Sequence, residues 1–312
     1  MRRLRRPMAC VNRAHGKTTC LDLSRMLNYT DRVRLLMEDI VRRVPALSFI
    51  DMREVLVFAR LGRTAAHGAY ATCHSLTVPD SEPAYYFWRD RRTGRLTRRS
   101  EWFVMRTPRV QVGGTDVKSL ISLTLPRFCD QTLRGSRKED VYEGCENWVA
   151  KIDTIVHELY HIDPRDSGIR KSVRGDGRPA AVTHPAQFFR DVAAMVHQYL
   201  DSRPEPNTYD FLRHGFSTLA HQHGAVVATT FRTYPSFPQR YRETLGTQPR
   251  LPRAAHVVPL TAARVQRVYT EADLESRQFL SHATRRVLAE AAHPVARGTY
   301  PRLVSGVAAQ RA

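Results

Sequence analysis

The sequence lacks the long apolar segments that mark membrane and secreted proteins. Its 312 residues contain no apolar run near the ~20 residues that a membrane-spanning helix needs. The basic start, Met1 to Pro7, is not followed by the apolar segment of a secretory signal. We therefore expect a cytoplasmic protein that makes no membrane contact.

Cysteine is scarce and poorly placed for cross-links. The five cysteines are odd in number, widely spaced and without any C-x-x-C pair, and none follows Cys145. A disulfide framework uses an even set of cysteines, and a zinc ribbon uses close pairs. We expect free thiols to which no chemistry is assigned.

Lysine is nearly absent from a strongly basic chain. Only 5 of the 49 basic residues are lysine, and the formal net charge is +19. A basic surface attracts polyanions, of which nucleic acid is the commonest. The arginines gather at residues 2–6, 89–99 and 232–253. Codon bias also produces such an excess, so a nucleic-acid contact and a solvated surface both stay open.

The spacing of apolar residues predicts an α+β fold. Residues that recur every three or four positions predict helices at 30–44, 146–162, 185–200, 209–220 and 270–292. Short apolar runs bounded by turn residues predict strands at 55–58, 84–88, 102–105, 120–125 and 226–231. The runs 84–88 and 102–105 flank a turn-like segment and predict a hairpin.

The helix predicted at 146–162 contains His157-Glu158-Leu159-Tyr160-His161, which fits the pattern H-E-x-x-H. Histidines four residues apart project from one side of a helix, so both imidazoles can bind one zinc ion. Glu158 can take a proton from a metal-activated water and deliver it to the leaving amine. The motif predicts a zinc peptidase with Glu158 as the general base. The alternative is a pair of surface histidines.

A catalytic zinc site needs a third protein ligand. No histidine lies at the short spacing after His161, and no glutamate occurs between Glu158 and Glu205. His184 lies 23 residues after His161, where the next predicted helix begins, on the apolar face of that helix. We expect His157, His161 and His184 to bind one Zn²⁺ per chain. An N-cap role for His184, without metal, stays open.

Three other residues compete for the third position. Asp163 would have to fold back against the restriction that Pro164 imposes. Asp191 lies two turns along the helix from His184, and His197 is rotated away from it by roughly 140°. We expect all three to lie outside the metal site.

The segments Thr154–Ile162 and His184–Phe188 resemble the SprT-like zincin metalloproteases, in particular the phage metallopeptidase family. In that group the H-E-x-x-H helix is followed by a loop and a segment His-Gly-x-x-aromatic, whose histidine is the third zinc ligand. His184 and Phe188 match this segment, and Pro185 replaces the glycine. The resemblance covers roughly residues 30–200.

The resemblance implies a small α+β unit in which an edge strand lines the cleft beside the active-site helix, a role that suits residues 120–125. It does not extend to the zinc ribbon of many relatives, because no cysteine follows Cys145. A link to DNA–protein crosslink repair is therefore not implied. A peptide substrate is expected to add to the edge strand as a further extended chain.

These observations predict a zinc-dependent endopeptidase with a zincin-like domain over residues 28–231. We expect a basic arm over 1–27, a Pro- and Arg-rich linker over 232–260, and a helical extension with a tail over 261–312. The partner is a protein or peptide substrate. The alternative function is a basic nucleic-acid-binding protein whose zinc site is structural or vestigial.

Overall fold

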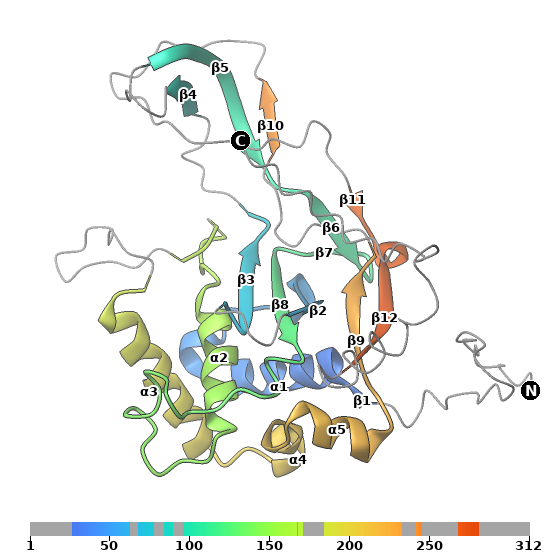
Figure 1. Ribbon diagram of the computed structural model, residues 1–312. Coiled ribbons are helices and arrows are strands. Elements are labelled where there is room, and N and C mark those ends of the chain that lie inside the picture. The colour runs from blue at the N-terminus through green and yellow to red at the C-terminus, as the bar shows by residue number, and fades with distance from the viewer. Residues whose placement is uncertain are drawn as a thin grey trace, which may run out of the picture. The chain divides into compact units, whose positions relative to one another are not determined.

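A computed structural model describes most of the chain between residues 27 and 280 (Figure 1). The fully described residues are 27–62, 68–77, 107–166, 168–170, 184–232 and 268–280, and residues 84–89, 96–106 and 241–244 are described by their backbone. Contacts divide the chain into Met1–Phe279 and Leu280–Ala312, so the described elements belong to the first unit.

The first unit is a mixed α and β structure with small sheets and five α-helices among the described residues. The helices are α1 (Tyr29–Arg43), α2 (Val149–Tyr160), α3 (Ala186–Asp201), α4 (Pro206–Tyr209) and α5 (Phe216–His223). Short 3-10 helices lie at Pro45–Leu47, Met52–Glu54, Asp210–Arg213 and Glu271–Asp273. None of the helices in the described ranges has the length and apolar character that crossing a membrane requires.

Twelve described strands form four three-stranded sheets. The strands are β1 (Leu27–Asn28), β2 (Val55–Leu61), β3 (Ala71–Ser75), β4 (Ala84–Arg89), β5 (Leu96–Arg106), β6 (Arg109–Val112), β7 (Thr115–Asp116), β8 (Ser119–Leu125), β9 (Val226–Phe231), β10 (Tyr241–Thr244), β11 (Val268–Tyr269) and β12 (Leu274–Phe279). The strand orders are β2-β8-β3, β1-β9-β12, β10-β5-β4 and β11-β6-β7.

The β2-β8-β3 sheet supports the helix that contains H-E-x-x-H. In this sheet β8 lies in the centre, parallel to β2 and antiparallel to β3. All seven residues of β8 are buried, as expected for a central strand with both faces covered. α1 packs against β2, and α2 packs against β3. The strand of this sheet that packs against α2 is therefore β3, which pairs only with β8 within the described residues.

Buried side chains fix α1, α2 and α3 to one another. On α2, Ile152, Ile155, Val156 and Leu159 are fully buried. The hydroxyl of Tyr199 on α3 donates a hydrogen bond of 3.0 Å to Asp39 on α1. Together with the sheet, these helices form the main core of the described residues.

Most of the predicted elements are confirmed. The predictions at 30–44, 146–162 and 185–200 correspond to α1, α2 and α3, and those at 55–58, 120–125 and 226–231 to β2, β8 and β9. The runs 84–88 and 102–105 lie in β4 and β5, which pair antiparallel as the hairpin requires. Asn28 caps α1 by accepting from the backbone N–H of Asp31, and Pro45 ends it.

Two predicted helices are corrected by the structure. The helix predicted at 209–220 is interrupted, because Gly215 is extended and begins α5, where Asp130 accepts from the N–H of Phe216 at 2.8 Å. The helix predicted at 270–292 is wrong for residues 270–279. There Thr270 and Asp273 form a capping box on a 3-10 turn, and β12 then pairs with β9. Pairing with a buried strand outweighs local helix propensity. Residues 281–292 lie outside the described part.

The assignment of residues 120–125 as the edge strand beside the helix that contains H-E-x-x-H is also wrong. Those residues form the central strand β8, and β3 is the strand that contacts α2. The expected basic arm lies outside the described residues, apart from its last residue. So does nearly all of the expected linker and of the extension beyond Leu280. The side chains of the arginine groups at 2–6, 89–99 and 232–253, Arg232 excepted, also lie outside them.

Candidate metal centre

The last turns of α2 carry His157, Glu158 and His161. Because α2 is covered along nearly its whole length, these side chains are largely withdrawn from water. His161 is 7% exposed and Glu158 is 6% exposed, whereas His157 is half-buried. The helix therefore holds two imidazoles and one carboxylate in a partly dry environment.

His184 reaches the same point from the segment that precedes α3. The N-cap of α3 is Pro185, so His184 is not the capping residue of this helix. Its side chain is exposed, which leaves the cluster open to solvent on that side. The Phe188 ring, one turn into α3, packs within 5.0 Å of the His184 ring, centroid to centroid.

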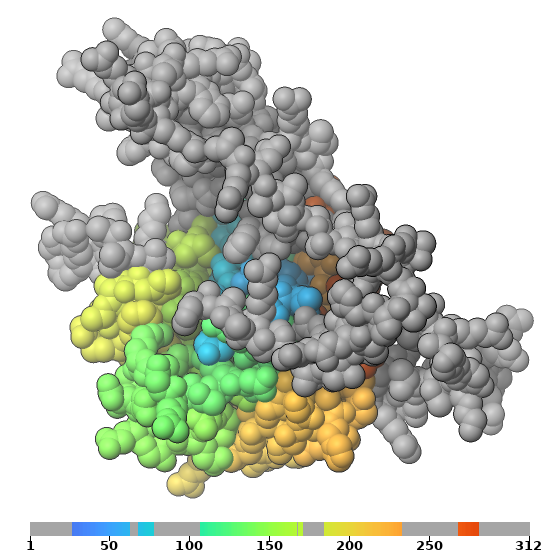
Figure 2. All heavy atoms as spheres, in the orientation of Figure 1, coloured from blue at the N-terminus to red at the C-terminus, as the bar shows by residue number. Residues whose placement is uncertain are grey.

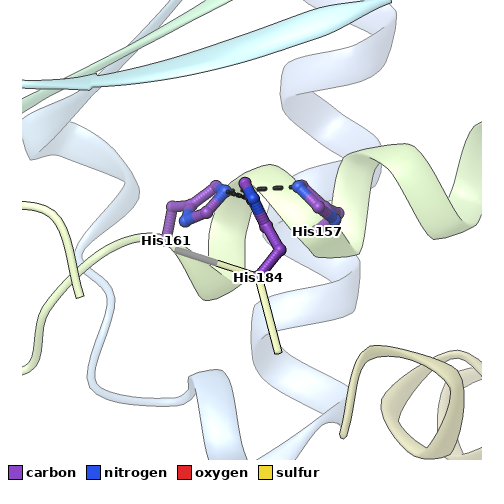
Figure 3. Close-up of side chains that lie close together, drawn as sticks. All are labelled: His157, His161 and His184. Carbon is purple, nitrogen blue, oxygen red and sulfur yellow. Dashed lines mark hydrogen bonds between the residues drawn. The ribbon is translucent and has the colours of Figure 1, made fainter. Parts of the chain in front are cut away.

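The three imidazoles converge through their Nε2 atoms (Figure 3). Nε2 of His161 lies 3.2 Å from Nε2 of His157 and 2.9 Å from Nε2 of His184. Ligand nitrogens in a tetrahedral zinc site, with Zn–N of about 2.0–2.1 Å, are separated by roughly 3.3 Å. The spacing of the three nitrogens therefore fits a shared metal ion, and the cluster can hold one.

The environment keeps these histidines neutral, the form that binds metal. Burial is the largest cause, followed by the neighbouring imidazoles, and together they lower the pKa of His157 to about 2. Burial and His184 lower the pKa of His161 to about 4. Burial also lowers the pKa of His184. If all three imidazoles were protonated, three positive charges would lie side by side. Neutral imidazoles avoid this repulsion and leave their nitrogen lone pairs available to a divalent metal ion.

Glu158 lies between the cluster and the sheet. Its Oε2 accepts a hydrogen bond of 2.7 Å from the backbone N–H of Cys73 on β3. Burial raises the pKa of Glu158 to about 7, although the Cys73 N–H opposes this rise. A carboxyl with a pKa near neutrality can both take up and release a proton. The structure thus places a buried carboxyl, next in the chain to His157, beside the histidine cluster.

Two phenylalanines of α3 line the cluster. Phe188 packs against His157 and His161, with ring centroids 5.0 and 4.9 Å apart. Phe189 stacks on His184 at 5.8 Å with an interplanar angle of 10°. These contacts fix the orientation of the imidazole rings without competing for their nitrogens.

A buried ion pair braces α2 one turn before His157. The Lys138 ammonium lies 2.6 Å from the carboxylate of Asp153. Lys138 also donates to Thr154 at 2.6 Å, and the Tyr142 hydroxyl donates to Asp153 at 2.8 Å. Both charged groups are nearly inaccessible to solvent. Only their close contact and their hydrogen bonds therefore offset the free-energy cost of removing the two charges from water.

The competing residues take other partners. Asp191 accepts from the Tyr160 hydroxyl at 2.9 Å and from Gln187 at 2.6 Å. Asp163 accepts from the backbone N–H of Arg165 at 2.7 Å. The exposed His197 faces the Tyr142 ring, 5.6 Å away. None of these three belongs to the histidine cluster found among the described residues.

Sequence reasoning missed two contributors to the site. Cys73 acts through its backbone, which no side-chain pattern reveals, although Ala71 and Cys73 alternate with the polar Thr72 and His74 as a half-buried strand requires. Lys138 lies in an irregular loop that has no helical or strand periodicity. The only sequence signal at this position is that lysine is rare in this arginine-rich chain.

Comparison of this chain with protein-family models, with curated proteins and with solved structures found no match.

Proposed function

We propose that this protein is a zinc-dependent endopeptidase of the zincin type, related to the SprT-like metalloproteases. The observation that carries the proposal is the convergence of His157, His161 and His184 beside the buried Glu158. The H-E-x-x-H helix and the following His184-Pro185-Ala186-Gln187-Phe188 segment support the family resemblance.

Zinc is the metal that suits this donor set best. Three neutral imidazoles, with no thiolate and no carboxylate among them, are a common protein set for catalytic zinc. The exposed side of His184 leaves room for a non-protein ligand. A bound zinc ion would lower the pKa of a water molecule and polarise the carbonyl of the bond to be cleaved.

Glu158 is the proposed general base. Cys73 holds Oε2 in place at 2.7 Å, which leaves Oε1 as the oxygen that takes the proton from the attacking water. The same carboxyl then donates that proton to the nitrogen of the leaving amine, so that Glu158 returns to its starting state. Burial raises its pKa to about 7, which suits both transfers near neutral pH.

The edge of β3 that faces away from β8 pairs with no strand among the described residues, and it is the proposed binding surface for the peptide, apart from the Cys73 N–H that Glu158 already occupies. The backbone of Thr72 and His74 faces β8 in the antiparallel register, so that of Ala71, Cys73 and Ser75 faces away from it. An extended peptide that pairs with this edge would lie alongside α2 and bring a backbone carbonyl towards the histidines.

The proposal is tested by zinc analysis and a cleavage assay on unfolded casein. The protein, purified without chelator, is expected to hold one zinc per chain and to cleave casein until zinc is removed. Glu158→Gln is expected to retain zinc and lose cleavage by a factor of about 10²–10⁴. Glu143→Gln, which alters an exposed carboxylate in the loop before α2, serves as the control. Protein without stoichiometric metal, or a Glu158→Gln variant with normal turnover, would refute the proposal.

A further inference from the structure

The loop of residues 126–148 is fixed against both helices that hold the histidines. Lys138 bonds to α2 through Asp153, and the Tyr142 ring lies 5.6 Å from the ring of His197 on α3. Figure 2 shows the surface of this loop, in green, adjoining that of α3, in yellow. A side chain of this loop therefore has a defined position relative to the metal centre.

Arg137, the residue before Lys138, lies over the Phe189 ring. Its guanidinium carbon is 3.4 Å from the ring centroid, the distance of a close cation–π contact. The same ring stacks on His184. A single phenylalanine ring thus connects the guanidinium group with the candidate ligand.

The guanidinium group of Arg137 lies close to the histidine cluster. It is 3.4 Å from the centroid of the Phe189 ring, and the centroid of that ring is 5.8 Å from the centroid of the His184 ring. The cation is therefore close enough to influence a charged group bound at the metal centre.

Within the described part of the chain, no hydrogen bond or ion pair occupies the guanidinium group of Arg137. The nearby carboxylate of Asp153 is already bound to Lys138 and Tyr142. Arg60, another cation near Glu158, instead donates to hydroxyl groups on β3 and β8. Arg137 is thus an exposed cation whose N–H groups have no hydrogen-bond partner among the described residues.

We infer that Arg137 is a specificity-determining residue that binds a carboxylate of the substrate, so that the enzyme prefers peptides with Asp or Glu beside the scissile bond. The inference rests on the proposed peptidase function. A guanidinium group that lies flat on an aromatic ring presents its edge, where paired N–H groups match a carboxylate. Its place one ring away from His184 suits a side chain next to the reacting carbonyl.

The test uses two small probes that bind zinc through a hydroxamate group. One is the monohydroxamate of succinate, which carries a free carboxylate, and the other is its carboxamide counterpart. Calorimetry on the zinc-loaded protein is expected to show about tenfold tighter binding of the carboxylate probe, as one charged hydrogen-bonded pair provides. Arg137→Gln should lose this preference and bind the carboxamide probe as the wild type does.

Arg134→Gln is the matched control, because Arg134 lies in the same loop and lines a separate pocket with Glu139 and Asp140. This variant should keep the tenfold preference. Equal or absent binding of both probes by the wild type, an unchanged preference in Arg137→Gln, or equal weakening of both probes would each overturn the inference. A protein that prefers the carboxylate probe but cleaves no casein would refute the peptidase function and support the anion site.

Peptide profiling extends the test to substrates. A library of tryptic peptides from a whole proteome is digested, and the residues beside each new cleavage point are identified by mass spectrometry. The wild type and Arg134→Gln should show enrichment of Asp and Glu at one subsite, and Arg137→Gln should cleave without it. Cleavage without acidic enrichment by the wild type would contradict the role of Arg137 while leaving the peptidase proposal intact.

Discussion

The backbone N–H of Cys73 donates a hydrogen bond of 2.7 Å to the carboxylate of Glu158, which joins β3 to the turn of α2 that carries His157 and Glu158. The bond constrains the carboxylate from the side of the sheet, while the helix fixes the Cα from the other side. The side chain of the proposed base is therefore held at both ends, and its carboxylate has little conformational freedom.

This constraint predicts a large effect of shortening the side chain. Glu158→Asp keeps the carboxylate but withdraws it by one methylene, so it can no longer both reach the Cys73 N–H and face the histidines. We expect casein cleavage to fall by about 10²-fold, the usual effect of a displacement near 1 Å. Zinc content, measured in parallel, should be unchanged. Near-normal cleavage would show that the position of this carboxylate does not limit the reaction.

His184 is predicted to be a metal ligand, and Asp191 is not. His184→Ala removes one of three converging Nε2 atoms and should weaken zinc binding by at least tenfold in a chelator competition assay. Asp191→Ala removes the acceptor of Tyr160 and Gln187 and should leave zinc affinity within about twofold. His197→Ala should do the same. The opposite ranking of His184 and Asp191 would place the third ligand on α3 itself.

Much of the histidine cluster could be predicted from the sequence, because it depends on the spacing of residues along a helix. Four-residue spacing on a helix brings His157 and His161 to one side, whatever the surrounding fold. His184 was predicted from the apolar face of the following helix, extended back to residue 184, and from the resemblance of His184 and Phe188 to the SprT-like segment. The structure places His184 before the N-cap residue Pro185 with an exposed side chain, so helical periodicity accounts for His157 and His161 but not for His184.

The supporting groups were not accessible because they depend on long-range contacts. β3 is short and contains few residues with strong strand preference, and its pairing with β8 decides its structure. The pairing of β12 with β9 likewise overrides a helical pattern. Lys138 meets Asp153 only after an irregular loop returns to α2. The residue pattern of a single sequence does not predict such long-range contacts.

Removal of one partner of the Lys138–Asp153 pair is predicted to destabilise the fold strongly. Lys138→Met leaves a buried carboxylate with only the Tyr142 hydroxyl, and the free energy of unfolding should fall by about 3–5 kcal/mol. Urea denaturation of the apo protein measures this change. The double variant Lys138→Met, Asp153→Leu should recover part of the loss, because no uncompensated charge remains. A single variant as stable as the wild type would mean that water reaches the carboxylate.

The pH dependence of stability should reveal the contribution of the ionised Asp39 carboxylate to the free energy of unfolding. Burial raises the pKa of Asp39, but hydrogen bonds from Arg43, Tyr199 and Arg42 outweigh burial and hold its pKa below the usual range. A carboxyl whose pKa is lower in the folded than in the unfolded state stabilises the fold above the unfolded value of about 4. That contribution disappears as the pH falls through the folded pKa.

Asp39→Asn is therefore expected to lower the free energy of unfolding at pH 7 by about 1–3 kcal/mol, since it weakens the charged hydrogen bonds that Asp39 accepts from Arg43 within α1 and from Tyr199 on α3. Urea denaturation at pH 7 and at pH 3 should show the difference between variant and wild type shrinking with acidification. The neighbouring Glu38→Gln is the control, because among the described residues Glu38 makes only an exposed pair with Arg34, so the substitution should change stability by less than about 0.5 kcal/mol at either pH. A variant–wild-type difference that stays constant between the two pH values would show that Asp39 acts through packing of its side chain and not through its charge.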